Sequence, residues 1–234
     1  MRIAVISDLH LGEGGDADAF GHDDAEFLGF LRRLEADFER VVLLGDIWET
    51  LTSPRLGDAR GALTRARDHH RELARRLATP PYRYVHGNHD HVAALEGAPT
   101  ELAIQAAGVR LLFTHGHQQD ALVRKMRWLS ELGVWLGAGL RRAGLGPIYR
   151  FAQRLDTQRG AATIDAARCG FQAWAIDLAR RREADVVVTG HTHLATRGEH
   201  GDRLFLNSGT CSEGRLSFLA IDTSRGDYRV VRER

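Results

Sequence analysis

"VISDLH", residues 5–10, ends an apolar run with an aspartate and a histidine, and this pattern decides the fold prediction. Four more segments follow short apolar runs in the same way: GDIWE (45–49), HGNHD (86–90), THGHQQD (114–120) and TGHTH (189–193). Each alone is compatible with ordinary turn chemistry, in which Gly, Asn and Asp are common. Their recurrence favours one site built from distant parts of the chain.

The composition is that of a globular protein. Of 234 residues, 43% are hydrophobic and 27% charged, so we expect a sizeable core in one domain over residues 1–234. A formal net charge of +1 gives no electrostatic reason to expect a nucleic-acid partner. Cys169 and Cys211 belong to no metal-binding cluster and are predicted to be unpaired. With no charged leader and no apolar run of about 20 residues, the expected localisation is cytoplasmic, with at most peripheral membrane contact.

Eight apolar runs predict the strands: RIAVIS, RVVLLG, YRYVHG, RLLFTHG, DVVVTG, RLFLNSG, RLSFLAID and DYRVV. The runs are mostly continuous, which indicates strands buried on both faces. Helical periodicity over residues 23–38, with Asp23 or Asp24 as N-cap, and from Ala59 to Leu77 separates the first three runs. This order implies right-handed crossovers in a layered α/β fold. Short turns near the end of the chain predict an antiparallel part of the sheet.

Polar side chains at the carboxyl ends of these strands are expected to meet at the edge where α/β folds bind ligands. The residues placed there are Asp8, His10, Asp46, Asn88, His115, His191 and His193. Imidazole nitrogens combined with carboxylate and amide oxygens suit Mn, Fe or Zn. Seven donors are too many for one tetrahedral ion, but suit two ions about 3.5–4 Å apart that share a bridging carboxylate.

The five segments together resemble the motifs of the calcineurin-like metallophosphoesterase family: DxH at 8–10, GDxxE at 45–49, GNHD at 87–90, HGH at 115–117 and GHTH at 190–193. The resemblance implies a four-layer α/β/β/α sandwich with a helical insert that acts as a lid. It also implies two sets of metal ligands: Asp8, His10 and His193 for one ion, and Asn88, His115 and His191 for the other, with Asp46 as the bridge.

The resemblance gives His89 the role of the family's non-ligand histidine, which lies near the scissile phosphate and acts on the transition state or leaving group. Asp46 and Asn88 are expected to serve catalysis through the metal ions. Two divalent cations bring the pKa of a shared water toward neutrality, so the expected reaction is attack of metal-bridged hydroxide on phosphorus. Mn²⁺ is the expected metal, with Fe or Zn as alternatives.

Residues 118–184 are predicted to form a helical insert, because this stretch is far longer than an ordinary loop of about 4–6 residues. A helix is expected from Ala121 to Arg142, and another from about Thr163. The first helix has two apolar faces: one carries Leu122, Met126, Leu129, Gly133, Leu136 and Leu140, and the other Trp128, Leu132 and Trp135.

The insert, together with GDIWE, HGHQQD and LFLNSGT, resembles the UDP-2,3-diacylglucosamine hydrolases of lipid A biosynthesis. These enzymes cleave a pyrophosphate to give lipid X and UMP. The resemblance implies that the insert sheathes acyl chains and that its arginines meet the pyrophosphate or anionic membrane lipid. Substrate contacts are expected from His117, Trp48, Arg124 and Arg127.

Other functions stay open at this point. The well-known proteobacterial lipid A hydrolases carry Arg and Asp where this chain has His89 and His117, so a general phosphodiester or a nucleotide is an alternative substrate. The insert could also simply pack on the body. A non-catalytic binding scaffold, like the retromer subunit of this fold, is the alternative of another class, although scaffolds tend to lose ligands. The expected partner is a phosphorylated small molecule or a lipid-linked substrate, and the oligomeric state is open.

Overall fold

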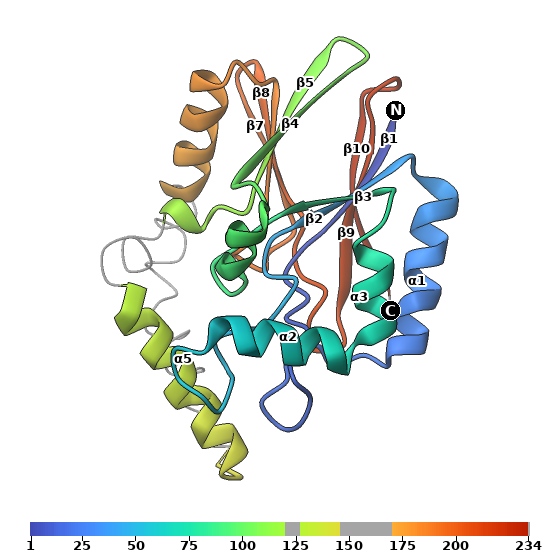
Figure 1. Cartoon of the computed structure of the whole chain (residues 1–234). Coiled ribbons are helices and arrows are strands. Elements are labelled where there is room, and N and C mark those ends of the chain that lie inside the picture. Colours follow the sequence, from blue (N-terminus) through green and yellow to red (C-terminus); the bar gives the residue numbers. More distant parts are fainter. Residues whose placement is uncertain (120–126, 146–169, 234) are drawn as a thin grey trace.

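The computed structural model describes residues 1–119, 127–145 and 170–233, which form two facing sheets flanked by helices (Figure 1). The first sheet contains, in order, β10 (Asp227–Glu233), β9 (Leu216–Asp222), β1 (Arg2–Ile6), β2 (Arg40–Leu44) and β3 (Tyr82–Val85). The second contains β4 (Glu101–Ala106), β5 (Val109–Thr114), β6 (Val186–Thr189), β8 (Arg203–Asn207) and β7 (Thr196–His200).

Parallel strands form the centre of this arrangement. β1, β2 and β3 are parallel to one another, and so are β5, β6 and β8. β9 and β10 pair antiparallel at one end of the first sheet, while β4 and β7 are the antiparallel edges of the second. The predicted antiparallel part near the chain end is therefore present.

Helices cover the outer faces of both sheets. α1 (Asp24–Asp37), α2 (Ala59–His69) and α3 (Arg71–Leu77) pack on the first sheet, and a helix over residues 170–181 packs on the second. Two short 3-10 helices, η1 (His91–Glu96) and η2 (His117–Gln119), follow β3 and β5. The layers are helix, sheet, sheet and helix, so the predicted four-layer α/β/β/α sandwich is confirmed.

Alternation of side chains along the strands divides the core in two. In β1, Ile3 and Val5 enter the core between the sheets, whereas Ala4 and Ile6 pack beneath the helices of the first sheet. β2 repeats this pattern, because successive residues of a strand face opposite sides. Strands buried on both faces need apolar residues at every position, which explains the continuous apolar runs.

All eight predicted runs are strands, but two further strands are not predicted. β4 and β7 lie at sheet edges, where half-buried and exposed positions alternate and charged or polar residues are tolerated.

The helix predicted from Ala59 to Leu77 is also wrong in detail. It is divided into α2 and α3 because His70, with φ −98° and ψ 50°, leaves the helical conformation. Asp23, rather than Asp24, is the N-cap of α1, and its side chain accepts hydrogen bonds from two backbone N–H groups.

The predicted insert is described only in part. α5 (Arg127–Arg142) ends at the predicted residue, while the predicted helix starts at Ala121 and Thr163 lie outside the described residues, as does Cys169. Cys211 is buried and free. The boundaries of the domain and of the insert at 118–184 stay predictions. Among the described helices, none combines the length and apolarity needed to cross a bilayer.

His70 makes a pH-dependent contact between α1 and the junction of α2 with α3. Its Nδ1 lies 2.7 Å from Asp24 Oδ1, and its Nε2 lies 3.8 Å from Asp18 Oδ2. Burial alone would lower the pKa of His70, but the two carboxylates outweigh it and raise the pKa above the ordinary value. The charged ring therefore stabilises the fold fully below about pH 6.5, and this contribution is lost as the pH rises through the raised pKa.

We expect His70→Gln to lower the free energy of unfolding by about 1–2 kcal/mol at acidic pH and by clearly less at alkaline pH. Urea unfolding of wild type and variant near pH 6 and near pH 9 measures the difference. Asp68→Asn, at an exposed position of α2, is the control. An equal loss at both pH values would contradict a contribution from the charged ring.

Candidate metal centre

The candidate ligands follow parallel strands of both sheets at a common edge. They are Asp8 and His10 after β1, Asp46 after β2, Asn88 after β3, His115 after β5, and His191 and His193 after β6. Backbone hydrogen bonds join the loops after β1 and β2, since Asp8 N donates to Gly45 O and His10 N to Asp46 O, each at 3.0 Å. Residues far apart in the sequence are thus held in one place.

The backbone of these loops is strained at the ligands themselves. Five of them adopt left-handed φ values between 52° and 67°: Asp8, His10, Asp46, His191 and His193. For a residue other than glycine this conformation costs about 1–2 kcal/mol. Such outliers persist where the surrounding structure enforces them, and they cluster at functional sites. The strain aims the side chains, so this observation marks the loops as a site.

One group of side chains brings together Asp8, His10 and His193. The atoms that each offers to a cation lie within 4.8 Å of one another. His193 Nε2 is 3.2 Å from Asp8 Oδ1, and Asp8 Oδ2 accepts a hydrogen bond from the backbone N–H of His191 at 3.2 Å. These are the three residues predicted for the first ion.

A second group brings together Asp46, His115 and His191, again with their ligand atoms within 4.8 Å. His115 Nε2 lies 3.1 Å from Asp46 Oδ2, and Asp46 Oδ1 accepts the backbone N–H of His89 at 2.8 Å. Asn88 directly precedes His89 in the chain, and its Oδ1 is buried. His115 and His191 belong to the second predicted set, and Asp46 is the predicted bridge; the assignment of these residues to two ions stays a prediction.

Two glycines of the motifs are required by close approach. A Cβ at Gly87 would lie 2.1 Å from Asp46 Oδ1, and a Cβ at Gly45 would lie 2.4 Å from His115 Nδ1. Gly45 also has a φ of 82°. Any side chain at either position would displace a candidate ligand. The glycines of the GD and GN motifs are therefore needed because Asp46 and His115 leave no room for a Cβ.

The hydrogen bonding of the buried atoms fits bound cations. Among the described residues, four of them form no hydrogen bond: Asp8 Oδ1, His10 Nε2, Asn88 Oδ1 and His115 Nε2. Asp8 Oδ1 and His115 Nε2 lie 3.2 Å from His193 Nε2 and 3.1 Å from Asp46 Oδ2, but without hydrogen-bond geometry. A buried polar atom without a partner costs about 1–3 kcal/mol, so four in one site need an explanation. All four belong to predicted ligands and are nitrogen or oxygen donors, the set that divalent Mn, Fe or Zn accepts.

Opposite charges dominate the electrostatics of the centre. Burial alone would raise the pKa of Asp46, but His115 and His89 hold it well below its usual value. Burial would likewise lower the pKa of His115, but Asp46 raises it to about 9. The site thus favours an ionised carboxylate next to positive charge. Divalent cations supply that charge without requiring protonated imidazoles.

Glu49 is a buried residue that the sequence reasoning left without a role. Its Oε2 accepts from His10 Nδ1 at 3.1 Å and from His89 Nδ1 at 2.8 Å, and its Oε1 accepts the backbone N–H groups of Leu51 and Thr52. It therefore fixes the ring orientation of both histidines. The only signal in the sequence is its position as the last residue of GDIWE.

Asp90 also supports the centre without belonging to either group. It accepts backbone N–H groups from Ile47, Trp48 and Gly87 and the hydroxyl of Tyr84. These contacts tie the loop after β2 to the loop after β3. The aspartate that ends GNHD is thus a structural link between two ligand-bearing loops.

His89 and His117, predicted to serve catalysis and substrate binding, both lie beside histidines of the candidate centre. The His89 ring lies 4.7 Å from the His10 ring, centroid to centroid, next to the first group. The ring of His117 lies 5.6 Å from the His115 ring, and its Nδ1 is buried and has no hydrogen-bond partner among the described residues. Burial, followed by the charge of His115, lowers the pKa of His117 to about 3, so this ring is neutral.

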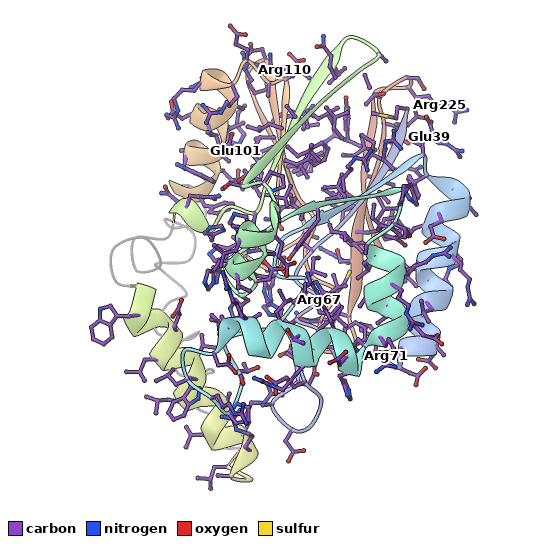
Figure 2. All side chains as sticks on the ribbon, in the orientation of Figure 1. Glu39, Arg67, Arg71, Glu101, Arg110 and Arg225 are labelled. Carbon is purple, nitrogen blue, oxygen red and sulfur yellow. The ribbon has the colours of Figure 1, made fainter. Side chains whose placement is uncertain are left out.

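The remaining predicted substrate contacts receive less support. Trp48 is only 4% exposed and lines a separate cavity of about 560 Å³, with the guanidinium of Arg67 from α2 5.7 Å from its ring centroid (Figure 2). Arg124 lies outside the described residues. Arg127 is the first residue of α5, but the structure describes only its backbone. Their substrate roles stay predictions.

A groove of about 1020 Å³ adjoins the centre and shares His191 and His193 with it. Its apolar walls include Phe171, Leu194 and Phe205, with other residues from loops of both sheets. This volume is at the upper end for small-molecule sites, about 300–1,000 Å³, and far exceeds what a phosphate needs. A ligand held at the metal centre therefore has room to extend along an apolar surface.

Comparison with known proteins supports the reading of the motifs. The sequence profile of the "Calcineurin-like phosphoesterase superfamily domain" matches residues 1–134. Vps29 from Chaetomium thermophilum is 15% identical over 99% of this chain and 95% of that chain, with a TM-score of 0.50. At this identity the likeness shows a shared fold and nothing of activity.

Two other solved structures are similar at lower TM-scores. An archaeal phosphodiesterase is 16% identical over 100% of both chains, with a TM-score of 0.47. Yfce, a phosphoesterase from E. coli, is 17% identical over 99% of this chain and 98% of that chain, with a TM-score of 0.45. A search of curated proteins finds no match.

We expect Glu49→Ala to weaken Mn²⁺ binding by about 10–100-fold, because His10 and His89 lose the acceptor that orients them. Isothermal titration calorimetry of the metal-stripped protein measures the affinity directly. Glu39→Gln, which alters an exposed carboxylate, should bind as wild type does. Unchanged affinity in Glu49→Ala would show that packing alone orients the two rings.

Proposed function

The chain belongs to the calcineurin-like phosphoesterase superfamily, and on this premise we propose that it hydrolyses a phosphoester with two divalent metal ions. One observation carries the proposal. Buried atoms of Asp8, His10, Asn88 and His115, all from loops at the same edge of the two sheets, form no hydrogen bond with the described residues. An acid–base site made of side chains alone would not leave these atoms unsatisfied.

The residues that would hold the ions are Asp8, His10 and His193 on one side and Asn88, His115 and His191 on the other, with Asp46 between them. When bound, two divalent cations activate water and neutralise charge on a phosphoryl group. The protein orients their ligands: Glu49 engages His10 through Nδ1, and the backbone carbonyl of Leu44 engages His115 through Nδ1 at 2.8 Å. In both rings this leaves Nε2 as the ligand atom.

His89 is the proposed acid that assists the leaving group. Glu49 occupies its Nδ1, so Nε2 is the atom available to donate a proton to a departing oxygen. Its backbone N–H binds Asp46 Oδ1, which fixes the position of His89 relative to the centre. The same residue thus supports a ligand with its main chain and faces the reaction with its side chain.

We propose UDP-2,3-diacylglucosamine, cleaved to lipid X and UMP, as the leading substrate and Mn²⁺ as the leading metal. The motif resemblance and the apolar groove beside His191 and His193 favour a lipid-linked pyrophosphate. His89 and His117, which replace the Arg and Asp of the well-known proteobacterial enzymes, favour the alternative of a general phosphodiester or a nucleotide. Either substrate class would use the same centre.

We expect the Mn²⁺-loaded protein to hydrolyse bis-p-nitrophenyl phosphate, and His89→Gln to lower kcat about 10²–10⁴-fold with Mn²⁺ content and KM little changed. His69→Gln is the control, because that histidine is exposed on α2. Release of p-nitrophenol and metal analysis are the measurements. Wild type that is folded and loaded, but inactive with every divalent metal tested, would support a binding scaffold instead.

We expect turnover of UDP-2,3-diacylglucosamine to exceed turnover of cyclic nucleotides and simple diesters, because only the lipid fills the groove. Leu194→Asp, in the apolar wall, should raise KM for the lipid and leave KM for bis-p-nitrophenyl phosphate unchanged. Product release is followed by chromatography. Activity on the soluble diesters with none on the lipid would exclude this substrate and leave the reaction class intact.

A further inference from the structure

The segment NSGT, residues 207–210, ends β8 and enters the loop that follows it. Asn207, Ser208 and Thr210 are 1%, 0% and 3% exposed, so their side chains need polar partners inside the protein. They find these partners on the loops that carry the candidate ligands Asp8 and His191. The three residues belong to neither group of candidate ligands, so they act through the residues that they contact.

Asn207 holds the loop after β6. Its Nδ2 donates to the carbonyl of Gly190 at 2.7 Å and to Thr189 Oγ1 at 2.9 Å, while its Oδ1 accepts the backbone N–H of Gly209 at 3.0 Å. Gly190 directly precedes His191 in the chain. The side chain of Asn207 therefore fixes the main chain at the point where the GHTH segment begins.

Ser208 and Thr210 hold the loop after β1. Ser208 Oγ lies 2.7 Å from Ser7 Oγ, and Ser7 Oγ donates to Asp8 Oδ2. Thr210 Oγ1 donates to the backbone carbonyl of Asp8 at 3.0 Å. Because β1 belongs to the first sheet and β8 to the second, these contacts join the two sheets at a candidate ligand.

The direction of hydrogen bonding along these hydroxyls follows from their protons, since each hydroxyl has one to donate. If Ser7 donated to Ser208, its lone pairs would face the negative charge of Asp8. Ser7 therefore donates to the carboxylate, which gives the stronger, charge-assisted hydrogen bond, and Ser208 donates to Ser7. The carbonyls of Gly209 and Thr189, at 3.3 and 3.2 Å, are the weaker acceptors for these two hydroxyls.

This arrangement makes the two carboxylate oxygens of Asp8 unequal. Oδ2 accepts the hydroxyl of Ser7 and the backbone N–H of His191, which together use its lone pairs. Oδ1 is buried and forms no hydrogen bond with the described residues, and it lies 3.2 Å from Nε2 of the candidate ligand His193. Oδ1 is therefore the oxygen that is left to face a cation.

We propose that Ser7 and Ser208 are positioning residues that make Asp8 a ligand through Oδ1 alone. Their hydroxyls keep Oδ2 occupied, so the carboxylate can neither rotate nor chelate a cation with both oxygens. Thr210 fixes the main chain of the same residue. The inference rests on the metal centre of the proposed function, but not on its reaction or its substrate.

A crystal structure of the wild type soaked with Mn²⁺ tests the proposal without any variant. We expect Mn²⁺ bonded to Asp8 Oδ1, with Oδ2 still accepting the hydroxyl of Ser7 and the backbone N–H of His191. Chelation by both oxygens, a bond through Oδ2, or no Mn²⁺ at Asp8 would overturn the proposal.

Isothermal titration calorimetry of the metal-stripped protein supplies the second test. We expect Ser7→Ala to weaken Mn²⁺ binding at one of two positions by about 10–100-fold and to leave the other position unchanged. Ser208→Ala should show a smaller loss at the same position, because Ser7 still donates to Asp8. Thr223→Val is the matched control, since it removes a buried hydroxyl that donates to the carbonyl of Met1, and it should bind as wild type does.

The outcomes separate this proposal from the proposed function. Mn²⁺ binding by Ser7→Ala equal to that of wild type would overturn the role of the hydroxyls, even if the wild type hydrolyses phosphoesters. An equal loss of affinity in Thr223→Val would do the same, because any buried hydroxyl would then suffice. Selective loss at one position in Ser7→Ala would support the role, and it would do so even if the wild type hydrolysed no phosphoester.

Discussion

The rest of the structure depends on stabilising two buried carboxylates. Asp8 and Asp46 are 0% and 2% exposed, and an ionised carboxylate removed from water is costly unless it is paired or bound to metal. The fold meets this requirement with imidazoles and with the backbone N–H groups of His89 and His191. These partners come from loops of both sheets. The two sheets must therefore keep a fixed relative position, and the core between them serves that purpose.

The same requirement explains the irregular backbone around the centre. Left-handed conformations at residues such as Asp8 and His191 turn side chains toward the shared point, at a cost that the surrounding hydrogen bonds must cover. Asp90 contributes by binding three backbone N–H groups from two loops. Gly87 lets those loops approach Asp46 without a clash. The candidate ligands are thus held in place by Asp90 and Gly87, which belong to neither group of candidate ligands.

Features that depend on a local sequence pattern could be predicted from the sequence, whereas features that depend on contacts between distant residues could not. Continuous apolar runs reveal the buried strands, and the polar residues after them indicate the candidate ligands, because both signals are local. β4 and β7 lack such a signal, since edge strands need only one buried face. The role of Glu49 is invisible in the same way, because its partners His10 and His89 lie 39 and 40 residues away in the sequence. Only the folded chain brings them together.

The helical spacing of apolar residues in the insert does not predict which side of α5 is exposed. The spacing of α5 predicts two apolar stripes, but the exposed row combines Leu136 and Leu140 from one stripe with Trp128 from the other. The buried positions of α5 are instead the small residues Gly137 and Ala138. Apolar content alone would have assigned the docking side to the larger residues.

The distinction between an enzyme and a scaffold turns on features that metal binding does not require. Ions would compensate the unpartnered atoms of Asp8 and His115 in either kind of protein. His89 is different, because neither predicted ligand set includes it, and yet Glu49 and its own backbone hold it beside the centre. A binding scaffold does not require an imidazole oriented in this way beside His10 and Asp46. The arrangement of His89 is therefore the strongest structural reason to regard the centre as catalytic.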